Sequence, residues 1–313
     1  MQVELRRGTV VESRHQVHVA VVNADTTLVA QAGDPQLVTF WRSAAKPFQA
    51  MPLVDDGAAE RFQLTSEDLA LICASHSSEP SQVARARDLL QTIGCSERDL
   101  LCGPHRPLSE PVAKDYETRG VRLTAVYSNC SGKHAGMLAL AKHHGWPTAF
   151  YTRLEHPVQQ RCLAEVARWT AVSAAKIGVG VDGCGVACFA MPLVSMALAY
   201  ARLEGPIRDA MLKHPELIAG EGRPCTDMMR AHPGRVITKV GAEGVYSAQL
   251  VQEKLGVALK VEDGHSVASA LAMAAVLSEL GLKPQPKSLG SRPTQNSRGE
   301  TVGEMRVNGG LVK

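Results

Sequence analysis

The spacing of apolar residues changes several times along the chain, and each change predicts a different element. Residues 17–33, VHVAVVNADTTLVAQAG, read as two strands joined by an N-A-D turn, which predicts an antiparallel hairpin. Residues 36–42 form a further short strand that runs directly into residues 43–56, whose apolar spacing is helical. Towards the end of the chain, residues 234–251 and 256–264 predict two neighbouring strands.

Helical spacing dominates the middle of the chain. A capped helix is predicted at 65–76, where Thr65 or Ser66 precedes acidic residues, and an amphipathic helix at 79–94. Further helices are predicted at residues 132–146, 155–171, 205–218 and 265–281. Strands therefore open and close the chain, and hairpins outnumber β-α-β units. This order predicts an α+β fold, with an antiparallel sheet flanked by helices and a mostly helical middle subdomain.

The length is compatible with one large domain. We expect residues 1–313 to form it, with the sheet built from both terminal parts of the chain. Residues 283–300 are polar and rich in proline, so this segment is predicted to be loop-like before a last strand.

The composition argues against several kinds of partner. Hydrophobic residues make up 45% of the chain and charged residues 21%, which is ordinary for a globular protein. A net charge of +3 is too small to indicate nucleic acid or an anionic membrane, and aromatic residues, at 4%, are too scarce for base stacking. The N-terminal residues lack the apolar stretch of a signal peptide, and no apolar run reaches transmembrane length. We therefore expect a cytoplasmic protein.

The motif S-x-x-K, the spacing of a serine nucleophile with a lysine base, occurs twice as SAAK. The copy from Ser173 to Lys176 follows a finished helix, so we expect a capping serine and a solvated lysine. Ser43 lies at a strand-to-helix junction, where Lys46 would share its helical face and free N–H groups could stabilise an oxyanion. The alternative is a helix-capping Ser43 with an exposed lysine.

A lysine base must be neutral, which requires help from its surroundings. Lowering the pKa of a lysine from about 10.4 to about 7 costs roughly 4–5 kcal/mol, which calls for burial and a second cation nearby. Lys239, in the apolar stretch VITKVGAEG, offers that cation. A K-x-G strand beside an S-x-x-K helix is the layout of penicillin-recognising serine enzymes. The alternative is an ordinary edge-strand lysine.

Three further stretches are rich in polar and sulfur-bearing side chains. Residues 128–134, SNCSGKH, feed a helix N-terminus that suits an anion or carboxylate, or form a polar cap loop. VDGCG at 181–185 places Asp182 and Cys184 on a glycine-flanked turn. CASHSSEP at 73–80 offers a second hydroxyl source or a capped helix start.

Cysteines add a possible metal site. The chain has eight, and without an export signal we expect free thiols, most of them small core residues. One possible thiolate-rich site consists of Cys130, Lys133, His134 and Cys184. The spacing of these residues matches no standard structural zinc pattern.

Together these motifs resemble the rhizobial-type (class 3) L-asparaginase family. The matching motifs, from about Arg14 to about Leu282, are RSAAKP, CASHSSE, CGPH, SNCSGKHAGML, VDGCG, GEGRPCTDMMR, KVGAEG and KVEDG. The resemblance implies a fold akin to serine β-lactamases and glutaminases, a homodimer, and hydrolysis of L-asparagine to L-aspartate and ammonia.

The resemblance also implies roles for individual residues. It pairs Ser43 with Lys46 and Ser75 with Lys239. It implies a Zn²⁺ ion that tunes substrate binding rather than activating water. The implied zinc ligands are Cys130, Lys133 and Cys184, the implied pocket residues are Arg42, His134 and Asp182, and the implied neighbouring thiol is Cys225.

In this interpretation Ser43 attacks the side-chain amide of asparagine and Lys46 takes its proton. Two other classes stay open. One is a glutaminase or β-lactam-recognising serine hydrolase, although YSNCSGK stands where an S-D-N element would be expected. The other is a zinc-sensing regulatory protein, for which the sequence has no DNA-binding signature.

Overall fold

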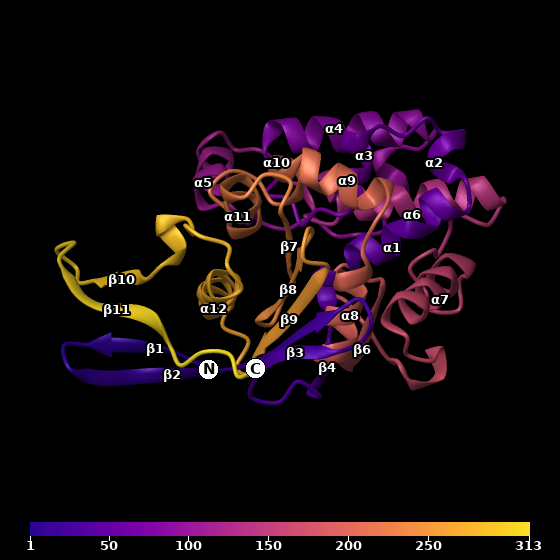
Figure 1. Ribbon diagram of the computed structural model, residues 1–313. Coiled ribbons are helices and arrows are strands. Elements are labelled where there is room, and N and C mark those ends of the chain that lie inside the picture. The colour runs from indigo at the N-terminus through magenta and orange to yellow at the C-terminus, as the bar shows by residue number, and fades with distance from the viewer. The chain divides into compact units, whose positions relative to one another are not determined.

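The computed structural model describes residues 1–313, which divide into two compact units (Figure 1). The sheet unit comprises Met1–Ala44, Met191–Leu203 and Asp227–Lys313. The helical unit comprises Ala45–Ala190 and Glu204–Thr226. No helix in either unit combines the length and apolarity needed to cross a membrane.

The sheet unit holds most of the strands and two long helices. Its strands are β1 (Gln2–Arg7), β2 (Val10–Asn23), β3 (Leu28–Ala32), β4 (Val38–Phe40), β7 (Val236–Val240), β8 (Val245–Leu250), β9 (Leu255–Val261), β10 (Arg292–Gln295) and β11 (Thr301–Asn308). Its helices are α8 (Leu193–Arg202) and α12 (Ser266–Glu279). The short 3₁₀ segments η1 (Arg42–Ala45) and η5 (Lys287–Leu289) also occur, although Ala45 already belongs to the helical unit.

The main sheet is antiparallel and joins the two ends of the chain. Its strand order is β10-β11-β1-β2-β9-β8-β7, with β3 paired to β2. Strand β1 lies between β2 and β11, so that Gln2 stands opposite Asn308. The antiparallel α+β fold and the hairpin predicted at 17–33 are confirmed. Helix α12 packs on β8 and β9 (Figure 1), and its almost wholly apolar sequence is accordingly buried.

Two segments of the sheet unit differ from expectation. Residues 234–251 form a hairpin rather than one strand, because Glu243 and Gly244 adopt positive φ and reverse the chain between β7 and β8. Residues 283–300, expected to be loop-like, contain η5 and the edge strand β10. Polar side chains on a solvated edge strand leave no apolar alternation in the sequence.

The helical unit holds most of the helices. They are α1 (Lys46–Asp55), α2 (Ala58–Arg61), α3 (Ser66–Ile72), α4 (Pro80–Thr92), α5 (Glu110–Thr118), α6 (Ser131–His144), α7 (Pro157–Thr170), α9 (Pro206–Lys213) and α10 (Pro215–Ile218). Its remaining elements are the strand β5 (Gly178–Val181) and the 3₁₀ segments η2 (Glu97–Asp99), η3 (Ala125–Tyr127) and η4 (Ala174–Lys176). Strand β6 (Ala187–Pro192) begins and α11 (Pro224–Ala231) starts in this unit, and β5 pairs antiparallel with β6.

Helix α6 forms the centre of the helical unit. Every residue from Ser131 to Ala141 is buried, and α1, α3, α4 and α7 pack around it. Helix α3 begins where the sequence indicated, because the Thr65 hydroxyl accepts a hydrogen bond from Asp68 N in a capping box.

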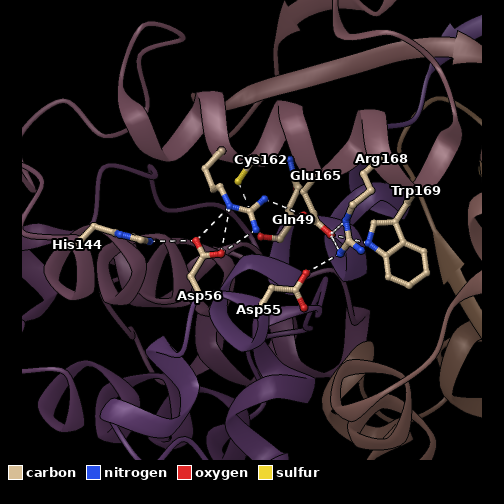
Figure 2. A network of polar contacts seen from close by, with 9 residues as sticks. Gln49, Asp55, Asp56, His144, Cys162, Glu165, Arg168 and Trp169 are labelled. Atoms are coloured by element: carbon tan, nitrogen blue, oxygen red, sulfur yellow. Dashed lines mark hydrogen bonds and ion pairs between the residues drawn. The ribbon is translucent and has the colours of Figure 1, made fainter.

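Helix α1 is fixed at its C-terminal end by a charged network with α7 (Figure 2). Arg161 donates to both carboxylate oxygens of Asp56, over 2.8 and 3.0 Å, and to Glu165 over 2.7 Å. The Glu165 side chain is only 2% exposed and also accepts hydrogen bonds from Arg168 and Trp169. Helix α1, which begins at Lys46, is therefore anchored to α7 at the end far from Lys46.

Candidate active site

Ser43 lies at a junction between a strand and a helix. Strand β4 ends at Phe40, η1 carries Ser43, and α1 follows at once. Arg42, just before the serine, has φ of 52°, a left-handed conformation that costs a non-glycine residue energy. Ser43 itself is half-buried. Backbone strain next to a partly accessible serine is typical of a functional position rather than of an ordinary helix cap.

The residues around Ser43 are fixed to the sheet unit. Trp41, which is fully buried, donates from Nε1 to Ser247 Oγ on β8 over 3.1 Å. The Tyr200 hydroxyl on α8 donates to Ala44 O over 2.8 Å. Ser43 thus lies between two anchored residues, which limits the movement of its backbone.

Lys239 lies on the neighbouring strand β7, where it stands opposite Ser247. Strand β7 is an edge strand of the sheet, as the alternative interpretation has it, but Lys239 has no exposed surface. A Cβ added to Gly241 would come within 2.9 Å of Trp41 O. The glycine of K-x-G therefore allows the end of β7 to approach the backbone two residues before Ser43.

Lys46, the first residue of α1, is completely buried. Its Nζ donates to Ala74 O at 2.5 Å and to Ser75 Oγ at 3.0 Å, and lies 3.5 Å from Asn129 O. This arrangement contrasts with the expected exposed lysine of a simple capping motif.

The second SAAK copy has the opposite environment. Ser173 and Lys176 are exposed, and Ser173 precedes the short 3₁₀ turn η4. The expectation of a solvated lysine at this copy is confirmed. Identical sequences thus produce one buried and one exposed lysine, and only the buried one has partners from distant segments.

Ser75 follows α3 in a segment without regular secondary structure. It is 3% exposed, and its N–H donates to Ile218 O over 2.9 Å. Ser77, two residues later, donates from Oγ to Ala219 O over 2.7 Å. The last residue of α10 and the residue after it therefore support the segment carrying Ser75.

The start of α6 brings the predicted thiolate site together. Lys133 Nζ donates to Cys184 Sγ over 3.0 Å. A hydrogen bond from Cys130 and the charge of Lys133 lower the pKa of Cys184 to about 5 despite burial. The same hydrogen bond, with burial, raises the pKa of Cys130 to about 12. The lowered pKa favours the thiolate form of Cys184, which Lys133 contacts directly.

This donor set fits a zinc ion in its chemistry. Two sulfurs and one amine converge from α6 and from the turn after β5, and thiolates are preferred zinc ligands. No group of three His, Cys, Asp or Glu side chains in the chain is arranged to hold a metal. Lys133 would have to serve as the third protein ligand, and zinc binding stays a prediction.

His134 is fully buried next to this site. Its Nδ1 lies 2.6 Å from the Tyr151 hydroxyl, whereas its Nε2 has no partner. Burial and then the nearby charge of Lys133 lower the pKa of His134 to about 3, so the ring is neutral. Asp182 lies on the turn that carries Cys184 and contributes negative charge at Lys133.

Two contacts of this region were not predicted. Tyr151 orients His134, yet it stands in a stretch without periodicity that offers no signal. His105, in the CGPH motif, accepts from Asn129 N over 2.8 Å and so fixes the carbonyl-bearing residue near Lys46. The quoted motif was the only hint of this second contact.

The predicted site residues divide between the two units. The sheet unit holds Arg42, Ser43 and Lys239. The helical unit holds Lys46, Ser75, Cys130, Lys133, His134, Asp182, Cys184 and Cys225, the last of which is buried in the first turn of α11. Within the helical unit, hydrogen bonds join Lys46 to Ser75 and Lys133 to Cys184. The pairs Ser43–Lys46 and Ser75–Lys239 combine residues of different units and stay predictions.

Comparison with known proteins identifies a family. A model of the L-asparaginase II family matches residues 3–307. No curated protein sequence matches the chain.

Several solved structures are similar at low identity. A β-lactamase from Mycobacterium bovis is 13% identical, with 84% of this chain and 94% of that chain covered and a TM-score of 0.33. A penicillin-binding protein homologue from Pyrococcus abyssi is 12% identical, with coverage of 84% and 73% and a TM-score of 0.38. A simvastatin synthase mutant from Aspergillus terreus is 10% identical, with coverage of 81% and 87% and a TM-score of 0.35. Scores of this size do not support a transfer of residue roles.

Proposed function

Because the chain belongs to the L-asparaginase II family, we propose that it hydrolyses L-asparagine to L-aspartate and ammonia with Ser43 as nucleophile. The family match confirms the resemblance inferred from the motifs and makes the protein an enzyme. It extends the resemblance from about Arg14–Leu282 to residues 3–307.

In the first step, Ser43 Oγ attacks the side-chain amide carbon of asparagine and Lys46 takes the hydroxyl proton. The observation that carries this proposal is the burial of Lys46, whose amine meets two carbonyls and a hydroxyl. A base in such a position is shielded from water and held in a fixed direction. N–H groups at the start of the helical segment near Ser43 would stabilise the oxyanion.

In the second step, the aspartyl ester on Ser43 is hydrolysed by water. Ser75 and Lys239 support both steps by keeping Lys46 neutral, by passing a proton to the leaving ammonia, or by both. The hydrogen bond between Lys46 and Ser75, over 3.0 Å, supports this role for Ser75. The complete burial of Lys239 supports a role for its amine inside the protein.

The charged ends of asparagine need counter-groups. Asp182 suits the α-ammonium group, and Arg42 or His134 suits the α-carboxylate. His134 Nε2 is a buried atom without a partner, which favours a polar ligand at this position. Cys225 would lie beside the bound substrate.

Cys130, Lys133 and Cys184 would hold a Zn²⁺ ion, which supplies positive charge next to the substrate pocket when bound. Without it, Lys133 neutralises the Cys184 thiolate and keeps α6 and the VDGCG turn together. We further propose a homodimer, as the motif resemblance implies, which sedimentation of the purified protein would test, and a cytoplasmic location.

Release of ammonia from L-asparagine tests the proposed nucleophile. Ser43→Ala should reduce turnover by about 10⁴-fold or more without unfolding the protein, because the covalent step is lost. Ser173→Ala, in the identical SAAK copy, is the matched control and should retain wild-type turnover. Near-native turnover of Ser43→Ala, together with loss in Ser75→Ala, would overturn the nucleophile assignment.

The same purified enzyme decides between substrates. L-glutamine and the β-lactam nitrocefin should be turned over far more slowly than L-asparagine. Preference for either of them would contradict the proposed substrate.

A further inference from the structure

His76 lies between two segments that carry site residues. It follows Ser75 directly, has no exposed surface, and belongs to neither of the proposed Ser–Lys pairs. Its Nε2 lies 2.8 Å from Ser131 Oγ, on the first residue of α6. Its Nδ1 lies 3.1 Å from Ser78 N, in its own segment.

These two contacts fix the tautomer of the imidazole. The Ser78 N–H can only donate, so Nδ1 must be the unprotonated nitrogen. The proton of the neutral ring therefore resides on Nε2, which donates to Ser131 Oγ. Burial lowers the pKa of His76 to about 3, which favours the neutral ring.

The hydrogen bond joins the two segments that surround the Lys46 amine. Ala74 O and Ser75 Oγ come from the segment of His76, whereas Asn129 O comes from the turn that leads into Ser131. The separation of these oxygens determines where Lys46 Nζ lies. His76 and Ser131 form a direct side-chain bridge between the two segments, one residue from Ser75 and two from Asn129.

We propose that His76 is a positioning residue, which sets the spacing of the oxygens around Lys46 through its hydrogen bond to Ser131. It does not contact the substrate. The inference rests on the proposed function, because it assigns the positioning to the reaction in which Lys46 is the base. A displacement of the amine by even about 1 Å can reduce a rate by about 100-fold.

Two near-isosteric substitutions separate the contacts of His76. In His76→Gln, the side-chain nitrogen can take the place of Nε2 and still donate to Ser131. In His76→Asn, the shorter amide can accept from Ser78 N but cannot reach Ser131. Ser131→Ala removes the same bridge from the other side. His143→Asn, on the last turn of α6, is the matched control for a histidine outside the site.

Steady-state kinetics on L-asparagine test the proposal. His76→Asn and Ser131→Ala should each lower kcat by about 10- to 100-fold with KM nearly unchanged. The double variant should be no slower than the worse single variant, because both changes remove one bridge. His76→Gln should recover kcat to within about tenfold of the wild type.

Other kinetic results would overturn the proposal. These are unchanged kcat in His76→Asn, multiplied effects in the double variant, or equal losses in His76→Gln and His76→Asn. A merely structural role predicts the last of these results, with parallel losses of thermal stability.

If the wild type releases no ammonia from asparagine, the proposed function is wrong. The hydrogen bond between His76 and Ser131 can still be tested without catalysis. In ¹⁵N NMR spectra, His76 should keep its proton on Nε2 from about pH 5 to 8. Exchange of that proton should be slow, and Ser131→Ala should accelerate it. Titration of the ring in this range, or protonation at Nδ1, would contradict the bridge.

Discussion

The amine of Lys46 meets three oxygen atoms inside the helical unit, and none of them belongs to a carboxylate. A buried amine without a counter-charge loses hydration that its surroundings replace only in part. The exposed Lys176 has no such constraint, although its local sequence is the same. The environment of Lys46 is therefore determined by residues 74, 75 and 129, which are distant from it in the sequence.

Replacing Lys46 should separate catalysis from folding. We expect Lys46→Met to lower kcat on L-asparagine by about 10²- to 10⁴-fold, because the proton acceptor is lost. Its unfolding free energy should fall by about 1–3 kcal/mol, because Ala74 O loses its donor. Lys176→Met is the matched control and should change neither the ammonia assay nor chemical denaturation. Full activity of Lys46→Met would rule out this lysine as the base.

Gly132 allows α6 to approach the end of α3. A Cβ at this position would come within 2.3 Å of Leu71 O. We therefore expect Gly132→Ala to destabilise the protein by about 1–3 kcal/mol and to disturb Lys133 next to it. Gly103→Ala, which would have no atom within 4 Å of its new Cβ, is the control. Equal denaturation midpoints for the two variants would contradict this close packing.

At the scale of elements, α1 depends on its ion pairs with α7. Burial opposes the charge of Asp56, but the hydrogen bonds from Arg161 and His144 outweigh it and lower the pKa of Asp56 below its ordinary value of 3.8. A lowered carboxyl pKa stabilises the fold above that ordinary value. The contribution is lost as the pH falls through the lower value of the folded state.

Asp56→Asn should remove this contribution. We expect the variant to be less stable at pH 7 by about 1–3 kcal/mol, since Arg161 loses a charged partner. The difference from the wild type should shrink as the pH falls below about 4. Denaturation by urea across this pH range provides the measurement.

The neighbouring residue gives a control of opposite sign. Burial and then the charge of Glu165 raise the pKa of Asp55. The stabilising contribution of Asp55 is therefore present at low pH and lost as the pH rises through its raised value. Asp55→Asn should not lower stability at pH 7. Equal losses of unfolding free energy in both variants would show that the network stabilises the fold by packing and not by charge.

The elements that were predicted correctly are those whose pattern lies in a short run of neighbouring residues. Residues 17–33 place two largely apolar runs on either side of a turn, Thr65 stands before acidic residues, and residues 265–281 are almost wholly apolar. Strand β10 was not predicted, because its side chains are mostly exposed and show no apolar alternation. The bridge from His76 to Ser131 and the contact of Tyr151 with His134 join distant residues, and no local spacing encodes such pairs.

At the scale of the whole molecule, the proposed zinc ion has two separable effects. Removing it with a chelator should raise KM for L-asparagine by about tenfold, with kcat within about threefold, if the ion tunes binding. Thermal stability should also fall, because zinc binds the folded state. Cys184→Ser should lose zinc, measured by metal analysis, and should resemble the chelated enzyme. A chelator that abolishes kcat would contradict a merely tuning role.

The central claim is that asparagine is hydrolysed through an ester on Ser43, and trapping that ester tests it most directly. The enzyme would be mixed with L-asparagine, quenched in acid during turnover, digested and mapped by mass spectrometry. The account predicts an aspartyl group on the peptide containing Ser43, and none on the peptide containing Ser173. An aspartyl group on Ser75, or turnover without any labelled serine under conditions that trap the ester in other serine hydrolases, would contradict it.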